Sequence, residues 1–197
     1  MITQLATGTL HNPSADYLGQ SFATPSSGGP WDNITFSFIA NGTPYAIGKA
    51  FLLMQPLPNG VYPETTSILP SMLNASVSGF VAEANATSNG QYVFDPTITL
   101  QPGVTYYVYE NALIPAETVS GGSVLTGPGN CCVSYYASAS SGYIPPPDGG
   151  SANFVLTGTP VTVNATPAPS TLILVLAGLV LLLALLTRSG VVRWSRT

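Results

Sequence analysis

Carboxyl groups and one histidine are the side chains from which this chain would have to build an acid–base catalyst. There are eight Asp and Glu residues and a single histidine, His11. Glu83 and Glu110 lie in segments that alternate like strands and could share a sheet face, and glycosidases hold two carboxyls about 5–10 Å apart. The alternative is that each is an outward-facing carboxylate, and no Gly-x-Ser-x-Gly motif accompanies His11. We therefore predict no enzymatic activity, with a secreted glycoside hydrolase as the least favoured alternative.

Aromatic residues are plentiful enough to form a ligand platform. The chain has ten Tyr and two Trp residues. Trp31 follows a Gly-Gly-Pro turn, and Tyr107 and Tyr109 fall on one face of the strand-like segment 97–111. Exposed rings of this kind pack against sugar rings, whereas buried ones line a core with their hydroxyls at its edge. Trp31, Tyr107 and Tyr109 are therefore candidate residues of a saccharide platform, and both interpretations stay open.

The two cysteines do not indicate a metal site. Cys131 and Cys132 are adjacent, with Cα atoms ~3.8 Å apart, whereas disulfides prefer roughly 4.4–6.8 Å, so a vicinal bridge would be strained. We favour two thiols on opposite faces of a strand over a redox-active or ligand-binding ring. His11 is distant in sequence, and no Asp-x-Asp-x-Asn-Gly calcium loop is present. The sequence thus predicts no metal and no cofactor.

Charge is scarce and unevenly distributed. Only 6% of the residues are charged, against about 25% in typical soluble domains, and Ser, Thr, Asn and Gly supply the polar surface instead. Lys49 is the only Lys or Arg before the C-terminal arginines. Because a surface without a basic patch does not follow a phosphate backbone, nucleic acid is excluded as a partner. The composition is typical of an exported protein with a nearly neutral surface.

Residues 1–163 carry the pattern of a single all-β domain. Short runs with period-two alternation recur between Gly, Pro and Asn residues, as "WDNITFSFIA" shows by placing Ile34, Phe36 and Phe38 on one face. No amphipathic helical stretch occurs before residue 171. These features predict an antiparallel β-sandwich. Tight turns are expected at three Asn-Gly dipeptides, which tolerate positive φ: Asn41-Gly42, Asn59-Gly60 and Asn89-Gly90.

The C-terminal region contains one long apolar run. Leu172 to Leu186 are fifteen uncharged residues, nine of them Leu. A helix of this length covers about 22 Å, less than a hydrocarbon core of roughly 30 Å, but its aliphatic side chains favour insertion by several kcal/mol. We predict a transmembrane helix over 171–187, with a buried core helix as the alternative.

The basic residues of the tail set the expected topology. Residues 188–197 hold all the arginines, and the positive-inside rule places this tail in the cytoplasm and the β-domain outside it. The opposite orientation would require every arginine to cross the membrane. The topology-setting residues are Arg188, Arg193 and Arg196.

The segment before the apolar run, residues 164–170, is a Pro-rich linker. Its Pro167-Ala168-Pro169-Ser170, followed by a short Leu-rich helix and terminal arginines, resembles the PEP-CTERM sorting signal of bacterial surface proteins, in which Ala168 would be Glu. The resemblance implies that an exosortase-type membrane protease cleaves near Pro169 and that the helix is temporary. The alternative is a permanent anchor on a Pro-stiffened stalk.

Motifs within the domain resemble a bacterial extracellular jelly-roll domain of the choice-of-anchor type. They are a Gln-Ser-Phe strand leading to Ile-x-Phe-x-Phe, a Leu-x-Pro-Gly-x-x-Tyr turn before an aromatic strand, and the closing "SANFVLTGTP". They cover most of residues 18–160. The resemblance implies a jelly-roll fold and supplies no catalytic residues.

The expected function is that of an exported structural or adhesive protein of the cell surface or extracellular polysaccharide matrix. A carbohydrate-binding module of a surface complex is the alternative, and self-assembly through sheet edges is also open. Because "MITQLATGTLHNPSADYLG" lacks the pattern of a signal peptide, we expect the exported chain to start upstream of Met1. A glycosylated single-pass ectodomain is a further alternative, suggested by sequons at Asn33, Asn41, Asn74, Asn85 and Asn164.

Overall fold

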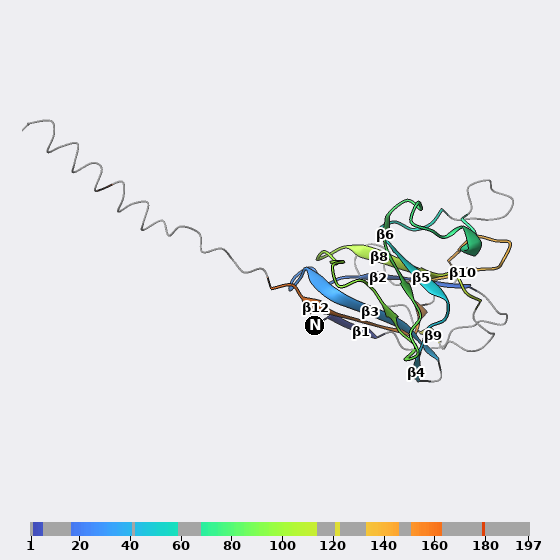
Figure 1. The fold of residues 1–197 in the computed structure, drawn as a ribbon, viewed down its shortest axis with the longest axis horizontal. Helices are drawn as coiled ribbons and strands as arrows, with labels where there is room; N and C mark the ends of the chain where they lie inside the picture. The colour runs from blue at the N-terminus through green and yellow to red at the C-terminus, as the bar shows by residue number, and fades with distance from the viewer. Residues whose placement is uncertain are drawn as a thin grey trace, which may run out of the picture. The chain divides into compact units, whose positions relative to one another are not determined.

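The computed structural model divides the chain into two units, Met1–Val161 and Thr162–Thr197. It describes residues 2–5, 17–40, 42–58, 68–113, 121–122, 133–145, 151–162 and 179. All the described strands belong to the first unit (Figure 1). Apart from one short 3-10 helix, Pro70–Met72, the regular structure described in this unit is entirely β.

Twelve strands make up the described secondary structure, and every pairing between them is antiparallel. The prediction of an all-β fold with antiparallel sheets is confirmed. The strands are β1 (Ile2–Leu5), β2 (Tyr17–Ala23), β3 (Trp31–Ala40), β4 (Thr43–Tyr45), β5 (Lys49–Leu53), β6 (Phe80–Asn85), β7 (Tyr92–Val93), β8 (Thr105–Glu110), β9 (Gly121–Gly122), β10 (Ser134–Ala137), β11 (Ser151–Ala152) and β12 (Phe154–Pro160).

Two five-stranded sheets contain most of these strands. The first has the order β1-β12-β3-β4, with β7 also paired to β3. The second has the order β10-β2-β8-β5-β6, and β11 pairs separately with β9. Neighbours in each sheet are often distant in sequence, as β12 is from β3, so the fold depends on long-range pairing.

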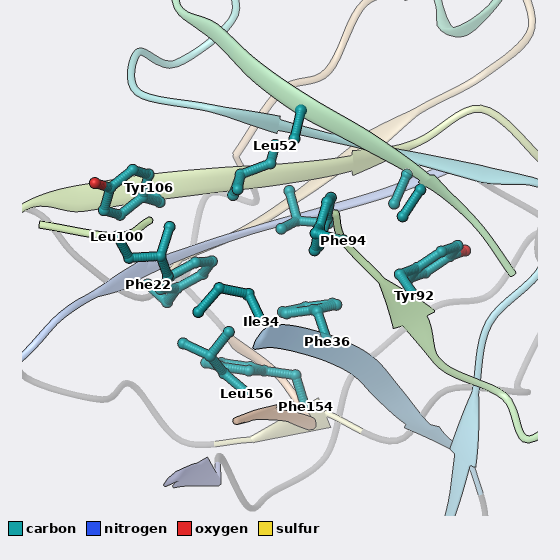
Figure 2. Close-up of a cluster of buried hydrophobic side chains, with 14 of the residues drawn as sticks. Phe22, Ile34, Phe36, Leu52, Tyr92, Phe94, Leu100, Tyr106, Phe154 and Leu156 are labelled. Atoms are coloured by element: carbon teal, nitrogen blue, oxygen red, sulfur yellow. The ribbon is translucent and has the colours of Figure 1, made fainter. Parts of the chain in front are cut away.

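A shared hydrophobic core lies between the inner faces of the two sheets (Figure 2). Phe22 of β2 stacks on Phe36 of β3 with ring centroids 6.3 Å apart, and Phe36 stacks on Phe154 of β12 at 5.4 Å. Ile34, Phe36 and Phe38 are all fully buried, which confirms the predicted inner face of β3. Burial of each such side chain contributes roughly 1.5–3 kcal/mol, so this core accounts for the contact between the sheets.

A second hydrophobic cluster covers the opposite, outer face of the sheet that contains β8. Phe51 and Leu53 of β5 and Tyr109 of β8 pack there with Leu57 and Leu73, which come from the segment between β5 and β6. Burial on both faces explains why β5 reads as an apolar run rather than an alternation, because no side of the strand faces water.

Two of the three predicted Asn-Gly turns can be checked at their glycines, Gly42 and Gly90, while Asn41 lies outside the described residues. Ala40 pairs with Thr43, so β3 and β4 form a hairpin with a two-residue loop, and Gly42 has a φ of +79°. Gly90 has a φ of +69° in the turn between β6 and β7. The positive φ at both glycines confirms these turns. Asn59-Gly60 lies outside the described residues.

The predicted transmembrane helix, residues 171–187, lies outside the described residues except for Leu179, which is helical and exposed. Within the described part of the chain, no helix is both long enough and apolar enough to span a bilayer. The predicted linker 164–170 and basic tail 188–197 also lie outside that part.

Candidate functional site

Several residues singled out from the sequence lie outside the described residues. These are the sorting motif and the topology-setting arginines, together with the adjacent cysteines and the histidine: Pro167, Ala168, Pro169, Ser170, Arg188, Arg193, Arg196, Cys131, Cys132 and His11. The candidate sites that can be described are the aromatic platform and the carboxyl groups.

Trp31 is part of the core rather than a loop surface. Its side chain is 2% exposed, and its backbone exchanges hydrogen bonds of 3.0 and 2.8 Å with Leu100. The indole covers Gly29 so closely that a Cβ there would lie 2.5 Å from the ring. The expectation that Trp31 offers a ring face to a ligand is therefore corrected. Because Gly29 has no side chain, the indole can pack over its backbone and into the core.

Tyr107 and Tyr109 do lie on one face of β8, as the alternation predicted. Their rings are nearly parallel, 3° apart, with centroids 6.4 Å apart. Tyr109, however, is 0% exposed, and its hydroxyl accepts a 3.3 Å hydrogen bond from the backbone N–H of Leu57. The segment after β5 thus covers Tyr109, which corrects its assignment to an exposed platform. Tyr107 is half-buried, and it is the one residue of the three platform candidates that is not fully buried.

Tyr109 belongs to a tyrosine cluster formed with Tyr107, Tyr135 and Tyr143. The ring centroid of Tyr109 lies 5.5 Å from that of Tyr135 and 4.7 Å from that of Tyr143. Burial, reinforced by Tyr107, raises the pKa of Tyr135 to about 12, and burial raises the pKa of Tyr109 and Tyr143 further. These hydroxyls therefore stay protonated at neutral pH and contribute packing and hydrogen bonds rather than a phenolate nucleophile.

Gly19 makes room for this cluster. It stands directly opposite Tyr109 in the β2–β8 pairing, and a Cβ on Gly19 would lie 2.4 Å from Cδ1 of Tyr109. The glycine inside a strand is thus explained by a neighbouring ring that lies over its backbone.

Glu110 occupies the inner face at the end of β8 and is completely buried. Its Oε1 is hydrogen-bonded to the hydroxyl of Tyr92, which lies on β7 of the other sheet. Figure 2 shows Tyr92 at one end of the core, with its hydroxyl pointing away from the other labelled side chains. Burial raises the pKa of the Glu110 carboxyl well above its usual range. A strongly perturbed, buried acid is a candidate functional group.

Glu83 does not share a sheet face with Glu110. Glu83 stands opposite Phe51 in the β5–β6 pairing, whereas Glu110 stands opposite Ala50 in the β5–β8 pairing. Because consecutive residues of β5 point to opposite faces, the two carboxyls do as well. Glu83 instead forms a 2.7 Å salt bridge with Lys49, with side chains 41% and 33% exposed. The possible carboxyl pair is therefore wrong, and within the described residues no three His, Cys, Asp or Glu side chains meet as metal ligands.

The Leu-x-Pro-Gly-x-x-Tyr motif has a structural role. Tyr106 at its end accepts a 2.9 Å hydrogen bond from the backbone N–H of Gln101, which closes the turn before β8. Thr24 of the neighbouring segment accepts a 3.0 Å hydrogen bond from Val104 N–H through Oγ1. The motif thus fixes the entry of β8 and, with it, the positions of the tyrosine cluster and Glu110.

Tyr92 and Tyr143 are the site residues that sequence reasoning missed. Tyr143 donates a hydrogen bond from its hydroxyl to the backbone carbonyl of Glu110. Both tyrosines are fully buried. Tyr92 lies in the alternating run "YVFD", in which Val93 is exposed, whereas Tyr143 follows a Ser- and Gly-rich stretch without alternation. Their contacts with Glu110 depend on chain segments that only the tertiary structure brings together.

Comparison with known proteins identifies no relative. No protein-family model matches the chain, and neither a curated protein nor a solved structure matches it.

Proposed function

We propose that this protein is an exported, membrane-tethered surface protein whose jelly-roll-like β-sandwich has a structural or adhesive role. The cell surface or an extracellular polysaccharide matrix is its location. The helix over 171–187 anchors it, with Arg188, Arg193 and Arg196 in the cytoplasm, and an exosortase-type protease releases the domain by cleavage at Pro167-Ala168-Pro169-Ser170.

The observation that carries this proposal is the position of the apolar run. The unit that contains all the described strands ends at Val161, and Leu172–Leu186 follows it between a Pro-rich segment and the arginines. The described members of both buried clusters belong to the first unit. A run of fifteen uncharged residues has no polar side to turn toward water and, as a helix, satisfies its own backbone hydrogen bonds, which suits it to lipid.

The two candidate catalytic carboxyl groups, Glu83 and Glu110, support a non-catalytic role. Glu110 is buried beneath the inner face, and Glu83 is engaged by Lys49 on the other face. A glycosidase needs two carboxyls converging on one bond, and these two diverge.

Intact mass and terminal peptides of the protein recovered from its native cells test the proposal. A chain in the envelope or medium that ends near Pro169 supports export and processing. A membrane-bound chain that retains Trp194 supports the permanent anchor and contradicts cleavage. A full-length chain in the soluble cytoplasmic fraction contradicts the proposal as a whole.

Saccharide binding is the second candidate function, favoured by the partial exposure of Tyr107. Its ring lies beside the Tyr109 ring and nearly parallel to it. Titration with a panel of polysaccharides should give saturable binding that Tyr107→Ala removes and Tyr107→Phe retains, because stacking needs the ring and not the hydroxyl. If Tyr107→Ala and Tyr107→Phe bind equally well, the saccharide binds at another surface and not at Tyr107.

A further inference from the structure

The Glu110 side chain connects the two sheets through one short chain of contacts. Its Oε1 meets the hydroxyl of Tyr92, and that hydroxyl also lies 2.6 Å from the carbonyl oxygen of Ile47. The same hydroxyl accepts a 3.0 Å hydrogen bond from the backbone N–H of Ile47. We call the contact between Glu110, Tyr92 and Ile47 the acid bridge; it joins β8 of one sheet to β7 of the other.

Counting hydrogens in the acid bridge assigns the protonation state of Glu110. A phenol has one hydrogen to donate, and the carbonyl of Ile47 has none. If Tyr92 donated to a carboxylate, its oxygen would face the Ile47 carbonyl oxygen at 2.6 Å without a proton between them. If instead the Glu110 carboxyl carries the proton, it donates to Tyr92, and Tyr92 donates to Ile47. Only the second arrangement satisfies every contact.

The surroundings of Glu110 also favour the neutral form. Among the described residues, the titratable groups that face it are tyrosines: Tyr92 on β7, Tyr45 on β4 and Tyr143 from the segment after β10. Ala50 of the adjacent strand stands opposite it. Lys49, the one basic side chain among the described residues, is bound to Glu83 on the other face of the sheet. Oε2 of Glu110 has no hydrogen-bond partner in the described part of the chain. Burying Oε2 without a partner costs less free energy when it is the uncharged carbonyl oxygen of a neutral carboxyl than when it is part of a charged carboxylate.

We propose that Glu110 is a neutral carboxylic acid that ties the two sheets together, and that its ionisation as the pH rises is a switch that loosens this end of the domain. The direction follows from proton linkage. The folded state holds the proton more tightly than the unfolded chain, whose Glu pKa is about 4.3. Stability from the acid bridge is complete below that pH and is lost as the pH rises toward the raised folded-state pKa of Glu110.

Equilibrium unfolding of the full chain in mild detergent between about pH 5 and pH 8.5 tests this switch, since tyrosines in the unfolded chain titrate near 10. The unfolding constant should rise by up to tenfold per pH unit, which is about 1.4 kcal/mol. In Glu110→Gln the amide donates to Tyr92 and does not titrate. The pH dependence of the unfolding constant should therefore be steeper for the native chain than for this variant, and the difference in slope is the contribution of Glu110. Glu83→Gln is the matched control, because its carboxyl is exposed and should leave the slope unchanged.

Parallel curves for the native chain and Glu110→Gln would overturn the proposal. If Glu110→Gln does not fold, carbon NMR of the native chain decides instead. The sequence has four glutamates, and the Cδ resonance of Glu110 should titrate above the ordinary Glu value of about 4.3. A Glu110 resonance that titrates near the ordinary value of about 4.3 would show a carboxylate at neutral pH and refute the acid bridge.

Discussion

Replacing Gly90 by alanine should disturb the turn that delivers Tyr92 to the acid bridge. Gly90 has a φ of +69°, and its N–H donates a 3.0 Å hydrogen bond to the carbonyl of Thr87. An added Cβ would lie 2.3 Å from the carbonyl oxygen of Pro44 in β4. The clash involves backbone on both sides, so relief requires the turn and β4 to move apart.

Gly42 provides a matched comparison for the magnitude. It has a φ of +79°, but a Cβ there would meet nothing within 4 Å. Gly42→Ala should therefore cost only the left-handed backbone penalty, about 1–2 kcal/mol. Gly90→Ala should cost that amount plus about 1–3 kcal/mol for overpacking, or about 2–5 kcal/mol in total.

Urea unfolding followed by fluorescence is a suitable assay, because buried Trp31 becomes exposed when the core opens. Both variants should unfold in one transition with similar m-values and different midpoints. Equal destabilisation by Gly90→Ala and Gly42→Ala would refute the reasoning, since it would mean that contact with Pro44 adds nothing to the cost of positive φ.

Further substitutions test the core, the buried polar contacts and the surface. Phe36→Ala should reduce the free energy of unfolding by about 3–5 kcal/mol, because its ring contacts aromatic rings of both sheets; calorimetry of the variant measures this loss. Thr24→Val should cost about 1–3 kcal/mol in the same measurement, since it leaves the backbone N–H of Val104 without the hydroxyl oxygen it donates to. Lys49→Ala should change stability by less than about 1 kcal/mol, because its salt bridge with Glu83 is partly exposed; a larger loss in a urea titration would contradict that estimate.

Alternation predicted which residues of one strand share a face. It did not predict which faces of different strands lie on the same side of a sheet. The side chains of Ile34, Phe36 and Phe38 share a face because a strand has a period of two, which is a local property. Whether Glu83 and Glu110 share a face depends on the register of two strands against β5, and that register is set by long-range pairing. Local pattern therefore could not decide between a carboxyl pair and two unrelated carboxyls.

For the aromatic residues, too, the sequence predicted which side chains share a face but not which of them are buried. The sequence indicated that Tyr107 and Tyr109 share a face, but it did not indicate that the segment reaching Leu57 covers that face. Trp31 follows a glycine-rich turn whose path could have placed the indole in water; packing against Gly29 placed it in the core instead. Exposure depends on what lies above a residue, which neighbouring residues in the chain do not specify.

The sequence by itself determined the all-β class, the antiparallel sheets, the turns at Gly42 and Gly90 and the inner face of β3. These features follow from side-chain alternation and from the backbone freedom of glycine, which act over a few residues. Only the tertiary structure decided that Glu110 contacts Tyr92 and that its carboxyl is buried away from water. The physical reason is that desolvation and hydrogen bonding depend on the whole surrounding shell, and here that shell comes from strands of both sheets.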